Sequence, residues 1–315
     1  MTSIAVMLCV AGWLLLAVTS CHHETGRHDV SALNLELDST LSRVRDMDSL
    51  QAMASSFQKR EDRVGEMLAL RHLGARMHDQ SLFGEAIETQ MHGLNIASEL
   101  ADTLEMAKAM IGIATNYRRM GDLRSSSTYL FKALELCDNY RDGQCDEALR
   151  CRMNTLNGIG KIETQLRNYT VADSVVRESL DCAISLQDYS GMAVNYGSLG
   201  AIKYYSGDID SAWVYYRDAM KYNEMAGHGI GVALCHLHFG ELHEAERRFS
   251  HAEEEYKMAY DELKQMGMSW YWLEACVALA RVSLKLYELD DAHMYLDEAE
   301  TESRRINSKS HLAEA

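Results

Sequence analysis

Apolar and polar positions alternate with a helical period through most of this chain, and the pattern repeats. In its clearest copy, bulky Leu199 precedes small Gly200; small Ala212, bulky Tyr216 and small Ala219 follow at fixed spacings. Apolar residues spaced three and four apart line one face of a helix. The spacing predicts two antiparallel helices, joined by a short turn, that pack through their small residues.

This helix pair recurs six times. The small residue that closes the first helix's apolar motif returns at Gly74, Ala114, Gly160, Gly200, Gly240 and Ala280. The steps are 40, 46, 40, 40 and 40 residues. One pair cannot bury its apolar face alone, so neighbouring pairs must stack. The sequence contains no proline, the strongest breaker of helix interiors, which also favours an all-α solenoid.

The repeat resembles the tetratricopeptide repeat, whose pattern also runs Leu-Gly, Tyr, Ala, Phe, Ala. The resemblance covers residues 63–305 and implies a right-handed superhelical solenoid of antiparallel helix pairs. Two departures stand out, since the period is 40 rather than about 34 and the closing proline is missing. Asp102, Asp188, Gly227 and Gly267 mark the breaks between repeats instead.

The segments that flank the repeats are expected to differ from them. Residues 31–62 are interpreted as a degenerate helix pair that caps the N-terminal end of the stack. Residues 306–315 form a polar tail, too short for a capping helix, whereas solenoids normally need a polar cap. The sixth repeat is therefore expected to be covered by a partner, by a second copy through self-association, or by a C-terminal continuation.

The first residues are typical of export. Residues 4–18 are uncharged and mostly apolar, too few for a spanning helix of about 20 residues but right for a signal peptide. They lead into Val18-Thr19-Ser20-Cys21, which resembles the bacterial lipoprotein box. We therefore expect a signal peptide at 1–20, lipidation of Cys21 and a polar tether at 21–30. Because residues 1–3 lack Lys and Arg, an uncleaved anchor stays an alternative.

Charge and motifs exclude several functions. The chain has 31 Lys and Arg against 47 Asp and Glu, a net charge of −16, which argues against nucleic-acid binding. It contains no GxSxG, no phosphate-binding glycine loop followed by Lys, and no HExxH. We expect no enzyme, no cofactor and no metal. His236, His238 and His243 are interpreted as packing residues of one helix rather than metal ligands.

Six cysteines remain after Cys9 in the signal peptide and Cys21 are set aside. Cys137, Cys145 and Cys151 bracket the insertion that lengthens one step to 46 residues. In an oxidising compartment, Cys145 could form a disulfide with Cys137 or Cys151. The alternative is that all six thiols stay free.

The resemblance also implies a binding surface, because the first helices of tetratricopeptide repeats line the concave face. The residues that map there are Arg71, Lys108, Thr115, Arg118, Arg119, Asn154, Asn157, Lys161, Tyr204 and Tyr205, with Glu241, Glu244 and Glu274 beyond them. A basic N-terminal half of the groove would suit the carboxylates of a protein or peptide. Ordinary charge on helix faces is the alternative.

Two functions remain from the sequence. The first is a non-enzymatic protein- or peptide-binding scaffold, exported and lipid-anchored in the bacterial envelope. The second follows from the likeness of long-period repeats to those of bacterial signalling proteins. The chain would then be the sensory half of a regulator whose kinase or DNA-binding output lies elsewhere.

Overall fold

The structure is a computed structural model that describes residues 26–140 and 145–306. The expected signal peptide, Cys21 and most of the polar tail lie outside the described residues. The chain divides into two compact units, residues 1–43 and 44–315. The described part of the first unit is one helix, α2 (Gly26–Ser42).

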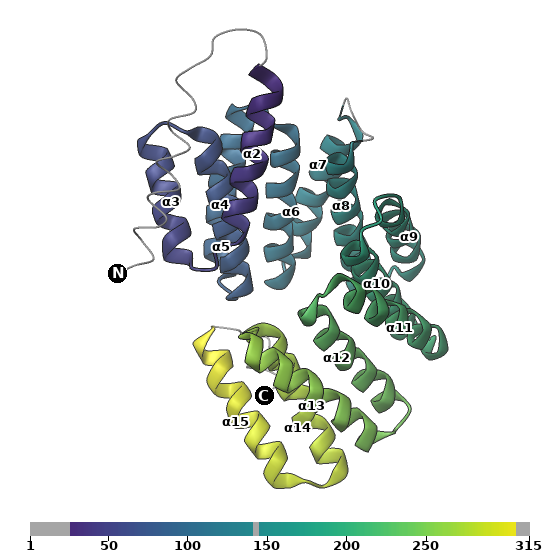
Figure 1. Cartoon of the computed structure of the whole chain (residues 1–315). Coiled ribbons are helices and arrows are strands. Elements are labelled where there is room, and N and C mark those ends of the chain that lie inside the picture. Colours follow the sequence, from purple (N-terminus) through teal and green to yellow (C-terminus); the bar gives the residue numbers. More distant parts are fainter. Residues whose placement is uncertain (1–25, 141–144, 307–315) are drawn as a thin grey trace. The chain divides into compact units, whose positions relative to one another are not determined.

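The second unit is a succession of helices in chain order, with no strand among its described residues (Figure 1). They are α3 (Met47–Lys59), α4 (Arg63–Asp79), α5 (Phe83–Glu99), α6 (Thr103–Arg119), α7 (Leu123–Asp138), α8 (Asp146–Gln165), α9 (Tyr169–Ser185), α10 (Tyr189–Ser206), α11 (Ile209–Ala226), α12 (Gly229–Ala245), α13 (Phe249–Met266), α14 (Ser269–Leu286) and α15 (Leu289–Arg305). Each helix packs against the next, and each even-numbered helix from α4 to α12 also contacts the following even-numbered one. The predicted all-α solenoid is confirmed.

The breaks between helices have the chemistry that the sequence indicated. The carboxylates of Asp102 and Asp188 accept hydrogen bonds from the backbone N–H groups of Glu105 and Gly191, the third residues of α6 and α10, as helix N-caps do. Gly227 and Gly267 end α11 and α13 in the left-handed conformation, at φ 65° and 70°. These residues replace the missing proline as the signals that stop one repeat and start the next.

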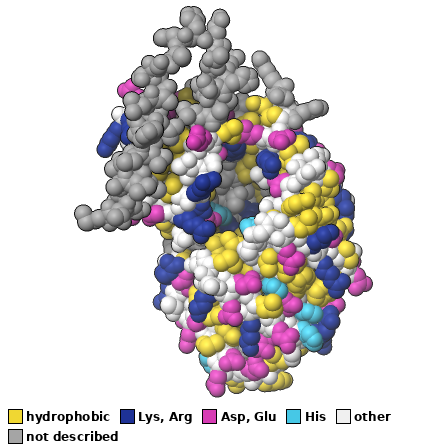
Figure 2. Space-filling view, viewed as in Figure 1, with side chains coloured by type: hydrophobic (Ala, Val, Ile, Leu, Met, Phe, Trp, Pro, Cys, Tyr) yellow, Lys and Arg dark blue, Asp and Glu magenta, His cyan; other side chains and the backbone are white. Residues whose placement is uncertain are grey.

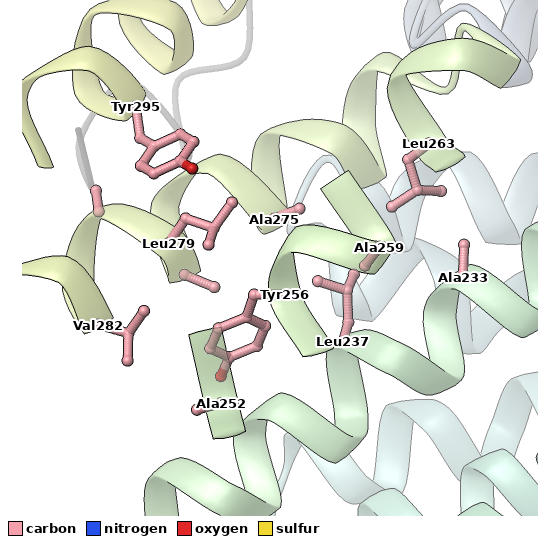
Figure 3. Close-up of a cluster of buried hydrophobic side chains, with 12 residues drawn as sticks. Ala233, Leu237, Ala252, Tyr256, Ala259, Leu263, Ala275, Leu279, Val282 and Tyr295 are labelled. Carbon is pink, nitrogen blue, oxygen red and sulfur yellow. The ribbon is translucent and has the colours of Figure 1, made fainter. Parts of the chain in front are cut away.

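A glycine facing an aromatic ring holds each of two central helix pairs together. A Cβ on Gly200 of α10 would lie 2.6 Å from the ring of Tyr216 on α11, and one on Gly240 of α12 would lie 2.3 Å from the ring of Tyr256 on α13. Both tyrosines are fully buried. Figure 3 shows Tyr256 among the aliphatic side chains of α12, α13 and α14. The bulky residue of one helix thus fits against the small residue of its partner helix.

Candidate functional site

The first helices of the six repeats, α4, α6, α8, α10, α12 and α14, carry the side chains that the sequence assigned to a groove. The position directly after each repeat's small residue is Lys161 on α8, Ala201 on α10, Glu241 on α12 and Arg281 on α14. Equivalent places in the stack therefore hold opposite charges. The environments of these charges decide which of them can meet a ligand.

Two of the expected groove cations are held by neighbouring helices. Arg71 on α4 lies 2.5 Å from Glu105 on α6, and Lys108 lies 2.7 Å from the same carboxylate. Lys108 also pairs with Glu147 on α8. These ion pairs join three successive repeats, so both cations stabilise the stack.

The expected polar contacts Thr115, Asn154 and Asn157 have different places. The Thr115 hydroxyl donates to the backbone carbonyl of Ile111. The Asn157 side chain is 5% exposed, and its amide donates to Asn195 and to Ser198 on α10, so it serves helix packing. Asn154 lines a pocket of about 220 Å³ between α8 and α10.

Arg118 on α6 and Lys161 on α8 have no hydrogen-bond or ion-pair partner among the described residues, although both are partly buried. Burial, followed by the charge of Arg119, lowers the pKa of Arg118 to about 10. Burial, followed by the charges of Arg118 and Arg119, lowers the pKa of Lys161 to about 7. The two cations therefore influence each other at a place where water solvates them poorly. Glu274 on α14 acts on Arg118 from a distance and opposes only part of this effect. A carboxylate arriving there would satisfy both.

The third cation, Arg119, joins α6 to a helix far along the chain. Its guanidinium donates to the Tyr271 hydroxyl and lies 3.7 Å from a Glu274 oxygen, both on α14. It also lies 5.3 Å from the centre of the Trp270 ring, a cation–π contact. The ring of Phe83 meets the same Trp270 edge-on at 5.1 Å. These contacts bring residues of repeats one and two against repeat six.

Acidic and aromatic side chains lie on the later helices. The Glu241 carboxylate on α12 accepts a hydrogen bond of 3.0 Å from Nδ1 of His238 on the same helix, and it pairs with no Lys or Arg in the described chain. Glu274 accepts the indole N–H of Trp270 at 2.8 Å. Burial raises the pKa of Glu274, against the opposing effect of Arg119. The rings of Tyr204 and Tyr205 on α10 meet edge to face, 5.3 Å apart.

In one polar cluster on α12, α13 and α14, every charged group has a partner. Arg281 on α14 donates three hydrogen bonds of 2.9, 3.1 and 2.8 Å to the Glu244 carboxylate on α12. The Tyr256 hydroxyl donates to the same carboxylate at 3.1 Å. We call Glu244, Tyr256 and Arg281 the closed triad.

The equivalent cluster one repeat earlier is incomplete. Forty residues before the closed triad stand Tyr204, Tyr216 and Glu241, which we call the open triad. The buried Tyr216 hydroxyl has no hydrogen-bond partner in the structure. Glu241 acts electrostatically on that hydroxyl, since burial and then Glu241 raise its pKa. The open triad has one carboxylate and two hydroxyls but no Lys or Arg.

The three histidines on α12 have packing roles. His236 bonds to Glu255 on α13 at 2.7 Å, and His243 meets the ring of Trp213 at 4.9 Å. His238 stacks on Tyr216 at 4.4 Å. Glu253, Glu288 and Asp291 bring three carboxylates together near the end of the stack, but Lys257 already pairs with Glu253 at 2.6 Å.

All six described cysteines are free. Cys137 and Cys151 are buried in one apolar cluster, whereas Cys145 caps α8 with its sulfur 3.4 Å from the Ala148 N–H. The buried neighbours are thus Cys137 and Cys151, and the suggested disulfide of Cys145 stays a prediction.

The face seen in Figure 2 has Lys and Arg side chains interspersed with Asp and Glu, and no broad basic patch. Within the described ranges, no helix combines the length and apolar character that crossing a membrane requires.

No protein-family model and no curated protein matches the sequence. Solved structures do match. NprR in complex with its cognate peptide NprX has a TM-score of 0.64 at 15% identity, covering 90% of this chain and 82% of that one. A Rap protein complexed with Competence and Sporulation Factor has a TM-score of 0.63 at 16% identity, covering 91% and 89%.

A third similar structure is a signal-transduction ATPase with a tetratricopeptide repeat sensor from Pyrococcus horikoshii. It has a TM-score of 0.57 at 15% identity and covers 84% of this chain and 39% of that one. The fold is a tetratricopeptide-like solenoid. Identities this low establish the fold alone, so a function has to be argued from the chain's own side chains.

Sequence reasoning found Arg118 and Lys161 but missed their surroundings. The contact of Arg119 with Tyr271 joins residues 152 positions apart, which no local spacing announces. The open triad could have been found by aligning the repeats, because Tyr204 and Glu241 break the pattern set by Glu244 and Arg281.

Proposed function

We propose that this chain is a non-enzymatic binding protein that holds a carboxylate-bearing peptide or protein segment in the groove of its solenoid. The proposal depends mainly on Arg118 and Lys161, which are partly buried, repel each other and form no hydrogen bond or ion pair in the described chain. Buried cations are normally paired, because desolvation costs an unpaired charge several kcal/mol. Charge-assisted hydrogen bonds to a carboxylate would repay that cost.

The solved structures support this proposal by analogy. NprR and the Rap protein have similar solenoids, and their complexes contain a cognate peptide and Competence and Sporulation Factor, respectively. The contacts of Arg119 with Tyr271 and Glu274 on α14 support the proposal, because they bring repeats two and six to opposite sides of the proposed groove.

The test is charge reversal. Arg118→Glu with Lys161→Glu should lower retention of a random peptide pool at least tenfold while helicity by circular dichroism is unchanged. Arg124→Glu with Lys132→Glu, at two exposed positions of α7, is the control, because it changes the net charge by the same amount outside the proposed groove. Equal retention by the parent chain and the double variant would refute the groove assignment.

We further propose that the chain is exported and held in the bacterial envelope by a lipid on Cys21. The support is the apolar run at 4–18 followed by the small residues before Cys21. Metabolic lipid labelling of the parent and of Cys21→Ala tests it. Label on the parent alone is the expected result, whereas an unlabelled, membrane-bound parent with an intact N-terminus would make residues 4–18 an anchor.

A second candidate function is the sensory half of a signalling regulator. The similar repeat sensor of the Pyrococcus horikoshii ATPase favours it. A purified signalling partner whose kinase or DNA-binding activity changes when this chain is added would support the sensor function over the scaffold.

A further inference from the structure

Two consecutive helix pairs build the same polar site with one difference. In α12–α13 the Tyr256 hydroxyl, the Glu244 carboxylate and the Arg281 guanidinium satisfy one another. In α10–α11 the same hydroxyl belongs to Tyr216, but the carboxylate position is Tyr204 and the guanidinium position is the carboxylate Glu241. A hydroxyl and a carboxylate thus remain without the cation that joins them in the closed triad.

The hydroxyl and carboxylate groups of the open triad are of the kinds that bind an ammonium ion. Glu241 supplies negative charge, and His238, 3.0 Å away, is its ion-pair partner in the described chain. Tyr204 and Tyr205 supply aromatic rings beside it, and aromatic faces attract cations. The Tyr216 hydroxyl is buried and unpaired, whereas the great majority of buried hydroxyls have a partner. Glu274, on the facing α14, adds a second carboxylate near Glu241.

The cations and the acid of the proposed groove occupy equivalent positions in different repeats. Lys161 and Glu241 occupy the same repeat position on α8 and α12, with Ala201 between them on α10. Packed helix axes are about 8–10 Å apart, so two steps span at most about 20 Å. An extended chain rises about 3.3 Å per residue, which makes the span about six residues. Ala201, which lies between the two ends, carries only a methyl group.

We propose that the open triad receives the amino terminus of a short peptide whose carboxyl terminus lies at Arg118 and Lys161. The inference rests on the proposed binding function and adds the direction, the two free ends and the approximate length of the ligand. A short peptide fits better than an internal segment of a long chain, because Arg119 closes the turn against Tyr271 and Glu274.

The experiment uses the purified full-length chain and one pool of random hexapeptides prepared in three forms: with free ends, N-acetylated and C-amidated. Retained peptides are quantified by mass spectrometry after ultrafiltration. The free pool should be retained best. Acetylation and amidation should each lower retention about tenfold, because each removes one terminal charge.

A double variant that is expected to fold stably distinguishes loss of binding from loss of folding. Tyr204→Glu with Glu241→Arg copies the closed triad into the open one, and should therefore raise the melting temperature. It should also make retention insensitive to acetylation while leaving the sensitivity to amidation. Glu88→Gln changes the net charge by the same amount outside the groove and should behave as the parent.

Two results would overturn the inference. If amidation lowers retention but acetylation does not, the carboxylate site stands and the amino-terminal site is wrong. If neither modification matters, or if no peptide is retained, both this inference and the proposed function fail.

Discussion

The helix pairs α10–α11 and α12–α13 are alike in their apolar halves and different in their polar ends. Each packs a glycine against a fully buried tyrosine, Gly200 with Tyr216 and Gly240 with Tyr256. Next to Tyr256, Glu244 and Arg281 are hydrogen-bonded to each other. The hydroxyl of Tyr216 has no hydrogen-bond partner. A solenoid can therefore keep one packing rule in every repeat and use the remaining positions either for stability or for a ligand.

The largest effect should come from breaking the shared packing. Gly240→Ala places a methyl group 2.3 Å from the buried ring of Tyr256, and should lower the free energy of unfolding by about 2–3 kcal/mol. Gly200→Ala should behave alike, because its Cβ would lie 2.6 Å from Tyr216. Chemical denaturation measures both.

Gly197 on α10 is the matched control for these substitutions. The nearest atom to its added Cβ is 4.0 Å away, so Gly197→Ala should stabilise the helix by up to about 1 kcal/mol. Similar losses at Gly197 and Gly240 would show that backbone freedom, and not the ring contact, sets the cost.

The next prediction is that replacing Lys161 increases stability while it weakens peptide binding. Because the folded pKa of about 7 is below the ordinary 10.5, the unfolded state binds more protons between these values, and this residue's contribution to stability rises with pH. Lys161→Met should therefore raise the free energy of unfolding by about 1–2 kcal/mol at pH 6, less than the pKa shift implies because the side chain keeps some exposure.

The gain from Lys161→Met should shrink as the pH rises toward 10, and retention of free hexapeptides should fall. Melting curves at pH 6 and pH 9 measure the first effect. A variant that is less stable than the parent at pH 6 would contradict the description of Lys161 as an uncompensated cation.

The closed and open triads can be compared directly by removing equivalent residues. Arg281→Met breaks three hydrogen bonds to Glu244 and should lower the free energy of unfolding by about 1 kcal/mol, a modest figure because Arg281 is half exposed. Glu241→Met removes no Lys or Arg contact in the described chain and should be nearly neutral, yet it should abolish discrimination against N-acetylated peptides. Equal losses of stability would mean that the open triad is a structural element too.

The sequence predicted the apolar packing of the helix pairs, but it predicted fewer of the polar contacts. The repeat of small and bulky residues located every helix pair from α4 to α15, because shape complementarity between neighbours has a fixed spacing. Asn157 was expected to meet ligand but is buried against Asn195, since an amide can serve either purpose from the same position. The contact of Arg119 with α14 depends on the curvature accumulated over four repeats, and no single repeat encodes it.

The smallest effect concerns the turns of the same two helix pairs. Gly207 ends α10 at φ 87°, whereas its equivalent Arg247, forty residues later, has φ 60°. The left-handed conformation costs a residue with a Cβ about 1–2 kcal/mol, and glycine recovers part of that difference while losing more chain entropy on folding. Arg247→Gly should therefore raise the free energy of unfolding by about 0.5–1 kcal/mol, and Gly207→Arg should lower it by a similar amount. Denaturant midpoints of the two reciprocal variants measure this, and a loss of stability in Arg247→Gly would reveal that the Arg247 side chain contributes more than its backbone costs.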